Sequence, residues 1–169
     1  MPRSRFMPAT PSAAALGRAW GEELDRVRSG WWTYAIHLTR DPHRAEDLIQ
    51  EALLRVLRQQ VSPGEVAPGY FFRVMRNAWI SDGRRITPRP MHARSEGAED
   101  EVDEHSGELV AALAMLSEPQ QEVVTLKHGA GLTLEQIALA TGRPLGTVAG
   151  QYRRGLGVLR SALASEIRS

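Results

Sequence analysis

The stretch from Gly131 to Leu163 constrains the fold of this chain more than any other. Thr133 and Gln136 have the spacing of an N-terminal capping box, and Gly142 stands where a left-handed residue would end a helix. Pro144 suits the first turn of a second helix. In that second helix apolar residues recur at spacings of three and four, namely Leu145, Val148, Tyr152, Leu156, Leu159 and Leu163. The pattern predicts a helix-turn-helix whose second helix buries this stripe and presents a basic, polar face.

An ordinary helical hairpin whose arginines face water would carry the same local signals, so the rest of the chain must decide. Its 169 residues are 42% apolar, which is enough for packed cores. The absence of cysteine excludes a disulfide scaffold, a zinc finger and an iron–sulfur site, and suits the cytoplasm. No apolar run is long enough to span a bilayer, so no membrane insertion is expected. The formal net charge is only +1, but two mildly basic blocks flank an acidic connector.

The first basic block predicts two amphipathic helices. Apolar residues between Arg18 and Leu38 have helical spacing, with an interruption expected near Gly30. Asp41 and Pro42 then cap a second helix from about His43 to Gln59. Its polar face carries Glu46, Asp47, Gln50 and Glu51. This face is either a solvated acidic first turn, which the helix dipole favours, or a binding surface for a partner.

A third helix is expected from Tyr70 to Arg85, with Phe72, Met75 and Trp79 pointing inward. Its outer positions are basic or polar, namely Arg73, Arg76, Asn77, Arg84 and Arg85. Arginines interleaved with aromatic residues such as Tyr70, Phe71 and Trp79 suit a single-stranded nucleic acid, because cations hold phosphates and aromatic faces stack on bases. A buried aromatic stripe with a solvated basic rim gives the same pattern.

The domain organisation follows from these elements. We expect a disordered tail over residues 1–17, a helical domain over 18–85, a flexible acidic linker over 86–107 and a four-helix domain over 108–169. The predicted fold is therefore all-α, with two small helical domains, and the C-terminal domain is a helix-turn-helix of winged-helix-like or homeodomain-like type.

Three segments together carry a family resemblance. They are LTRDPHRAEDLIQEALLRVLR, FFRVMRNAWISDGRR and LSEPQQEVVTLKHGAGLTLEQIALATGRPLGTVAGQYRRGLGVLR. In this order, and separated by an acidic linker, they resemble the bacterial RNA polymerase sigma factors of the sigma-70 family, in the extracytoplasmic-function (ECF) group. The resemblance covers nearly everything from Arg18 to Leu163.

The resemblance implies a sigma factor that binds core RNA polymerase, through the β′ clamp coiled coil and the β subunit, and directs it to promoter DNA. An anti-sigma factor is a further candidate partner. By resemblance, the polymerase contacts are Glu46, Asp47, Gln50 and Glu51. The third helix resembles the region that reads and melts the promoter minus-10 element, through Arg73, Arg76, Asn77, Arg84 and Arg85. The helix-turn-helix resembles the minus-35 reader, with Arg143, Thr147, Gly150, Gln151, Arg153 and Arg154 at or near the DNA groove.

Two departures from the family pattern keep other interpretations open. Asn77 is followed four residues later by Ser81 instead of aspartate, and Ala149, Gly150 and Gln151 replace longer or more polar residues in the recognition helix. A stand-alone helix-turn-helix regulator and a polymerase adaptor with degenerate promoter reading are the alternatives. An enzyme is disfavoured, because the five histidines lack a metal-binding spacing and no phosphate loop or nucleophile elbow is present. We therefore expect no catalytic residue, no metal and no cofactor.

Overall fold

The structure is a computed structural model that describes residues 11–83 and 104–166. Within these ranges every regular element is helical, which confirms the all-α prediction. The elements are α1 (Ala13–Thr39), α2 (Pro42–Arg58), the 3₁₀ turn η1 (Pro63–Glu65), α3 (Tyr70–Ser81), α4 (Glu104–Ala114), α5 (Glu118–Val124), the π-helical turn η2 (Thr125–Gly129), α6 (Leu134–Thr141) and α7 (Leu145–Glu166).

Local caps set the ends of the first two helices. Ser12 caps α1 by accepting a hydrogen bond from the amide of Ala15 at 3.2 Å. Arg40, in the left-handed conformation with φ of 57°, ends α1. Asp41 then caps α2 by accepting a hydrogen bond from the amide of Arg44 at 2.9 Å. Because the link is so short, α2 folds back against α1.

The core of the N-terminal half is built from aromatic residues. Helix α1 passes through Gly30 without the expected interruption, which brings Trp31 and Trp20 over α3. The rings of Trp31 and Phe71 stack with centroids 3.7 Å apart. Phe71 and Trp79 are both buried, so they belong to the core. The inward placement of Trp79 is therefore confirmed, and of the two interpretations of Phe71 the structure shows the buried aromatic stripe and not the exposed stacking surface.

The C-terminal half follows its predicted capping signals closely. Ser117 and Gln120 form the capping box of α5, and Thr133 and Gln136 form that of α6. Gly142 ends α6 in the left-handed conformation with φ of 68°. The helix-turn-helix of α6 and α7 is thus confirmed, with the predicted end of α6 at Thr141, while α7 runs to Glu166, beyond the predicted Leu163.

Several boundaries differ from the sequence expectations. Helix α1 begins at Ala13, within the predicted tail, while residues 1–10 lie outside the described residues. Helix α3 ends at Ser81, before the expected Arg85. Helix α4 begins at Glu104, so the last four positions of the predicted linker are helical, whereas 86–103 lies outside the described residues.

Helix α7 buries less of its leucine stripe than the pattern predicts. Val148 is fully buried, but Leu145 is 44% exposed, and the later stripe residues are only partly covered. Gly155 is buried instead, and a Cβ added there would lie 3.3 Å from Cγ2 of Val124. The glycine therefore lets α7 approach α5 closely, which compensates for its low helix propensity.

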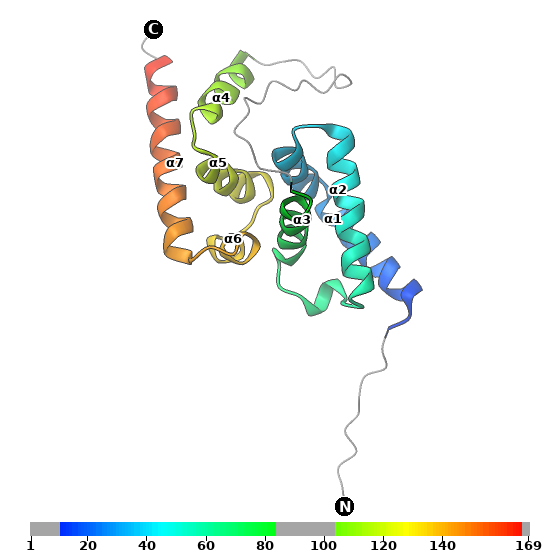
Figure 1. The fold of residues 1–169 in the computed structure, drawn as a ribbon. Coiled ribbons are helices and arrows are strands. Elements are labelled where there is room, and N and C mark those ends of the chain that lie inside the picture. Colours follow the sequence, from blue (N-terminus) through cyan, green and yellow to red (C-terminus); the bar gives the residue numbers. More distant parts are fainter. Residues whose placement is uncertain (1–10, 84–103, 167–169) are drawn as a thin grey trace, which may run out of the picture.

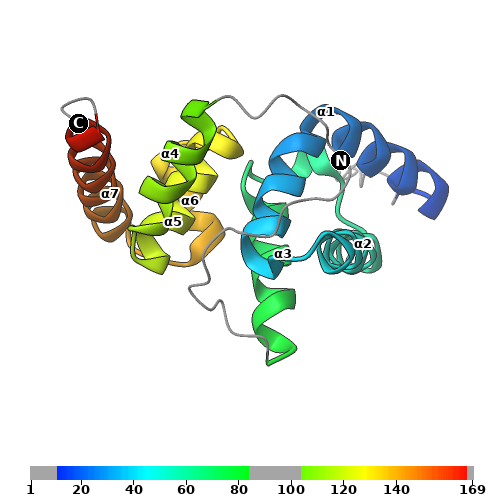
Figure 2. The same cartoon turned by 90° about the horizontal axis from the view of Figure 1, so that it is seen from above.

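The two halves pack against each other. Figure 1 shows α1, α2 and α3 on one side and α4 to α7 on the other, and Figure 2, seen from above, shows α3 beside the C-terminal half. Contacts of α3 with α6 and of α1 with η2 join the halves. One hydrophobic cluster extends through both, from Trp31 and Phe72 to Leu126 and Ile137. No described helix is both long and apolar enough to cross a membrane.

Candidate functional site

The acidic face of α2 lies on the surface. Ala45, Leu48 and other apolar positions of α2 are buried, which turns the opposite side of the helix to solvent. Glu46, Asp47 and Gln50 are exposed on that side. Glu51, half-buried, pairs instead with Arg55 at 2.6 Å on the same helix.

An exposed leucine extends this acidic face. Leu54 follows Gln50 by four residues and Asp47 by seven, so the three side chains lie on one stripe of α2. Leu54 is 52% exposed, so it adds an apolar side chain to the acidic stripe. Helical periodicity alone could have placed Leu54 on this face, but its exposure depends on what the other helices leave uncovered.

Helix α3 divides its predicted site residues between two environments. Arg73 and Asn77, four residues apart, are exposed with Ile80 on one stripe of the helix. Arg76 points instead into the seam between the halves, where its side chain is only 17% exposed. The prediction that Arg76 lies on the outer surface of α3 is therefore wrong, because its guanidinium group pairs with the buried carboxylate of Glu122. Arg84 and Arg85 lie outside the described residues.

The start of α7 is the open part of the helix-turn-helix. Leu145, Gly146 and Thr147 are exposed there, as are Arg153 and Arg154 further along. The remaining predicted residues are less accessible: Gln151 is half-buried, Gly150 is buried with the guanidinium of Arg154 near it, and Arg143 is half-buried.

A buried carboxylate joins the two halves. Glu122 of α5 has no exposed surface. Its Oε1 accepts hydrogen bonds from the hydroxyl of Tyr34 at 2.7 Å and from Nε of Arg76 at 3.0 Å. Its Oε2 lies 2.7 Å from a guanidinium nitrogen of Arg143. Tyr34 and Arg76 belong to the N-terminal half and Arg143 to the C-terminal half, so we call these four residues the seam cluster.

The seam cluster sets the ionisation of its members. Burial by itself would raise the pKa of Glu122, but the charges of Arg76 and Arg143 hold that pKa below its ordinary value. Burial, followed by the carboxylate of Glu122, raises the pKa of Tyr34 well above its ordinary value. Glu122 is thus anionic and Tyr34 neutral near pH 7. Beside the cluster, Arg40 donates a further hydrogen bond across the seam to Gln121.

The sequence pattern does not mark Glu122 as a functional residue. The one available signal is its spacing, because Glu122 lies four residues before Leu126 and so shares a face with a core leucine. A carboxylate on a core face needs a cationic partner. Which arginines supply it depends on how the two halves pack, and that is not readable from local sequence.

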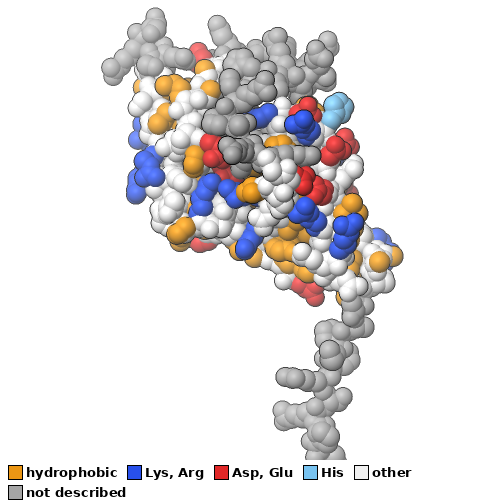
Figure 3. Space-filling model, viewed as in Figure 1, with side chains coloured by type: hydrophobic (Ala, Val, Ile, Leu, Met, Phe, Trp, Pro, Cys, Tyr) orange, Lys and Arg blue, Asp and Glu red, His pale blue; other side chains and the backbone are white. Residues whose placement is uncertain are grey.

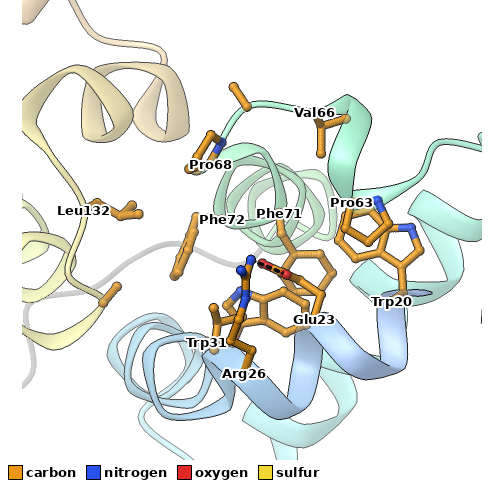
Figure 4. Close-up of a pocket in the computed structure, with 14 residues that line it drawn as sticks. Trp20, Glu23, Arg26, Trp31, Pro63, Val66, Pro68, Phe71, Phe72 and Leu132 are labelled. Carbon is orange, nitrogen blue, oxygen red and sulfur yellow. Dashed lines mark hydrogen bonds and ion pairs between the residues drawn. The ribbon is translucent and has the colours of Figure 1, made fainter. Parts of the chain in front are cut away.

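The structure has two notable hollows. Figure 4 shows one of about 200 Å³, lined mainly by the N-terminal half, for example by Trp20 and Phe71, with Leu132 among its few residues from the C-terminal half. None of the predicted site residues lines it. The second, of about 550 Å³, lies between α1 and the helices α4, α5 and α7. Among the described residues no three His, Asp or Glu side chains are grouped as a metal site would require.

On the face shown in Figure 3, Lys and Arg side chains do not form a single surface, because they are spread over both halves and mixed with acidic ones. The exposed stripe of α3 and the start of α7 are therefore two separate candidate contact surfaces.

Comparison with known proteins identifies the family. Residues 22–87 match the model of sigma-70 region 2, and residues 106–159 match that of sigma-70 region 4. The chain is 31% identical to the ECF RNA polymerase sigma factor SigL of Mycobacterium tuberculosis over 95% of this chain and 96% of the relative. It is also 31% identical to the RNA polymerase sigma-E factor of Streptomyces coelicolor, over 78% of each chain.

A solved structure has the same fold. The sigma factor RpoE of Bartonella quintana, determined in complex with the anti-sigma factor NepR, superposes with a TM-score of 0.61 at 25% identity, covering 86% of this chain and 96% of that one. The two matched regions, the relatives that span nearly the whole chain and the shared all-helical fold agree with one another. The chain therefore belongs to the sigma-70 family of RNA polymerase sigma factors, in its ECF group.

Proposed function

We propose that this sigma factor binds core RNA polymerase through the acidic face of α2 and directs it to promoters through α3 and α7. The observation that carries the proposal is the exposed face of α2. Glu46 and Asp47 pair with no described residue, although basic side chains lie elsewhere on the surface. Exposed acids around an exposed leucine are suited to a basic partner surface with an apolar centre.

Leu54 is the expected anchor of this polymerase contact. Interface energy concentrates in a few central side chains that lose their water on binding, while surrounding charges steer and orient the partner. Leu54 has acidic and polar neighbours on the N-terminal side of its stripe and half of its surface free to be covered. We assign the binding energy mainly to Leu54 and the orientation mainly to Glu46, Asp47, Gln50 and Glu51.

Promoter DNA would meet two surfaces. We assign the contacts with the minus-10 element to Arg73 and Asn77 of α3, which are exposed, together with Arg76 once it leaves the seam, and with Arg84 and Arg85. At the minus-35 element, Thr147 and the exposed Leu145 can reach base edges, where apolar side chains contact thymine methyl groups. The phosphate contacts at the minus-35 element are assigned to Arg143, Arg153 and Arg154, with Gln151 and Gly150 beside the groove.

The chain would contribute binding energy and strand positioning, while the polymerase performs the chemistry. It would act in the cytoplasm, where the polymerase and its promoters are. An anti-sigma factor, such as the one bound to the sigma factor of Bartonella quintana, is a further partner that fits the family.

Mapping of transcription starts with purified core polymerase tests the proposal. The chain should direct initiation at defined sites and bind promoter duplex poorly by itself. Asp47→Lys should weaken core binding by about fivefold, equivalent to about 1 kcal/mol. Glu22→Lys makes the same charge change at an exposed position of α1 and serves as the matched control.

Two results would contradict the proposal. Equal core affinity of the Asp47→Lys and Glu22→Lys variants would show that the polymerase does not bind the acidic face of α2. Tight, sequence-specific binding of promoter duplex without polymerase would favour the stand-alone regulator.

A further inference from the structure

Ile80 is an exposed apolar side chain near the end of the helix that we assign to the minus-10 element. It lies three residues after Asn77 and seven after Arg73, so the three side chains share one stripe of α3. Ile80 is 45% exposed, whereas the apolar residues on the inner side of α3 are buried. Figure 2 shows this end of α3, in brighter green, projecting away from the other helices, so a large ligand can reach it.

The aromatic side chains along α3 are engaged in the core. Phe71 stacks on Trp31, while Phe72 and Trp79 are only 5% and 4% exposed. These three rings cannot enter a stack of bases while the core is intact. Ile80 is therefore the large aliphatic side chain that α3 leaves at its surface, beside the two polar residues assigned to DNA.

An exposed isoleucine on a DNA-facing stripe is suited to separating base pairs. Apolar side chains, isoleucine among them, act as wedges between base steps, where they take the place of a lost stacking contact. Isoleucine is branched at Cβ and strongly prefers one rotamer in a helix, so Ile80 is rigid before it meets the DNA. It supplies what Arg73 and Asn77 lack, a compact apolar surface that can lie against the face of a base.

The spacing of the stripe matches the spacing of bases. At a rise of about 1.5 Å per residue, Arg73 lies about 10 Å and Asn77 about 4.5 Å from Ile80 along the helix axis. Base steps repeat at about 3.4 Å, so Arg73 can hold a phosphate about three steps from the wedge. Asn77 can then bond the edge of the neighbouring base. The hydroxyl of Ser81 donates a hydrogen bond to the carbonyl oxygen of Asn77 at 2.7 Å, within the helix.

We propose that Ile80 is the wedge that separates base pairs at the edge of the melted minus-10 segment, and that Arg73 and Asn77 set its register on the strand. This inference rests on the proposed function and adds to it a side chain that makes no polar contact. The role is confined to opening the duplex, because a wedge between base pairs is needed only while those pairs are still stacked.

Paired and premelted templates separate opening from binding. A promoter found by the mapping of transcription starts is prepared as a full duplex, and also with unpaired bases from the minus-10 element to the start. With core polymerase, Ile80→Ala should lower initiation on the duplex about tenfold, equivalent to about 1.4 kcal/mol, and on the premelted template by less than about twofold. The variant should fold, because Ile80 is largely exposed and alanine has the higher helix propensity.

Two control variants test whether the effect is specific to a wedge. Leu109→Ala removes an aliphatic side chain of similar exposure, 47%, from α4, and should not lower initiation on the duplex more than on the premelted template. Ile80→Leu keeps a large apolar group and should retain about half or more of the activity on the duplex.

A fluorescent base measures the opening step directly. The base analogue 2-aminopurine, placed in the nontemplate strand of the minus-10 element, becomes brighter when it leaves the stack. Its fluorescence should rise about tenfold more slowly with Ile80→Ala than with the natural chain, matching the loss of initiation on the duplex. The rate should be unchanged with Leu109→Ala.

Three results would overturn the wedge. An equal loss of initiation on both templates would place Ile80 in a binding contact instead, and unchanged initiation on the duplex or an unchanged rate of fluorescence rise would remove it from opening. In each case the natural chain still initiates, so the proposed function stands. Failure of the natural chain to initiate on either template would overturn the proposed function and the wedge with it.

Discussion

The stability of the folded chain should depend on pH through His37. This side chain lies on α1, is only 3% exposed, and neither of its ring nitrogens has a hydrogen-bond partner among the described residues. Its ring stacks near that of Tyr34, with centroids 6.0 Å apart. Burial, assisted by the positive charge of Arg40 and opposed by the negative charge of Glu122, lowers the pKa of His37 from 6.5 to about 4.

The sign and size of the effect follow from this lowered pKa. The folded chain keeps His37 neutral, whereas the unfolded chain protonates it below about pH 6.5, so the unfolded state binds the extra proton first. The stability contributed by the neutral imidazole is complete above pH 6.5 and is lost as the pH falls through about 4. Between pH 7.5 and pH 5 the loss amounts to about 2 kcal/mol.

Urea denaturation at pH 7.5, 6.5, 5.5 and 5.0 measures this loss. His37→Leu replaces the imidazole with an apolar side chain that cannot titrate, so the variant reports the pH dependence of all other groups. The free energy of unfolding of the natural chain should fall about 2 kcal/mol further than that of the variant over this range. Parallel pH profiles of the two proteins would show that His37 is hydrated or already charged in the folded chain, and would refute its burial there.

Three further predictions concern separate parts of the structure. Gly69→Ala should lower the melting temperature by about 4–8 °C, because φ is 94° and the added Cβ would lie 2.8 Å from a backbone oxygen of α6. The control is Gly157→Ala, at an exposed helical position with open space around it, and this change should raise the melting temperature slightly. Similar shifts for both glycines would argue against the contact of α3 with α6. Leu54→Ala should weaken core polymerase binding about tenfold in a pull-down titration. The melting temperature should stay nearly unchanged, since half of this leucine is exposed. Unaltered affinity would show that Leu54 is not the anchor of the polymerase contact. Replacing both Arg153 and Arg154 with alanine should lower the salt dependence of promoter binding by the polymerase complex by about two units of log–log slope, and an unchanged slope would place them off the DNA.

Local signals predict local structure well in this chain. The capping boxes at Ser117 and Thr133 depend on residues three positions apart, and both form in the structure. The exposed acidic face of α2 follows from helical periodicity, since the apolar stripe through Leu48 can be buried only if the opposite side faces solvent. These features need no knowledge of the rest of the fold.

The failures arise where distant parts of the chain meet. Arg76 has the spacing of an outward residue, but Glu122 lies 46 positions away in sequence and draws it into the seam. Gly155 has a low helix propensity, yet it is the point where α7 can approach α5. Phe71 has the pattern of an accessible aromatic residue and is instead covered by Trp31. In each case a tertiary contact outweighs a local preference.

The seam cluster places one buried carboxylate between cationic groups of both halves. Burying a carboxylate with arginines adds little net stability, because desolvation offsets much of the attraction, but removing every partner is strongly destabilising. Glu122 shares the C-terminal half with Arg143, so opening the seam leaves it with a cationic partner and gives it water. Arg76, on the other half, is released and can pair with phosphate instead. Separating the halves at this point would therefore exchange one anion for another at Arg76 and would also lose the apolar contacts of the hydrophobic cluster that both halves share, and promoter DNA can supply the replacement anion.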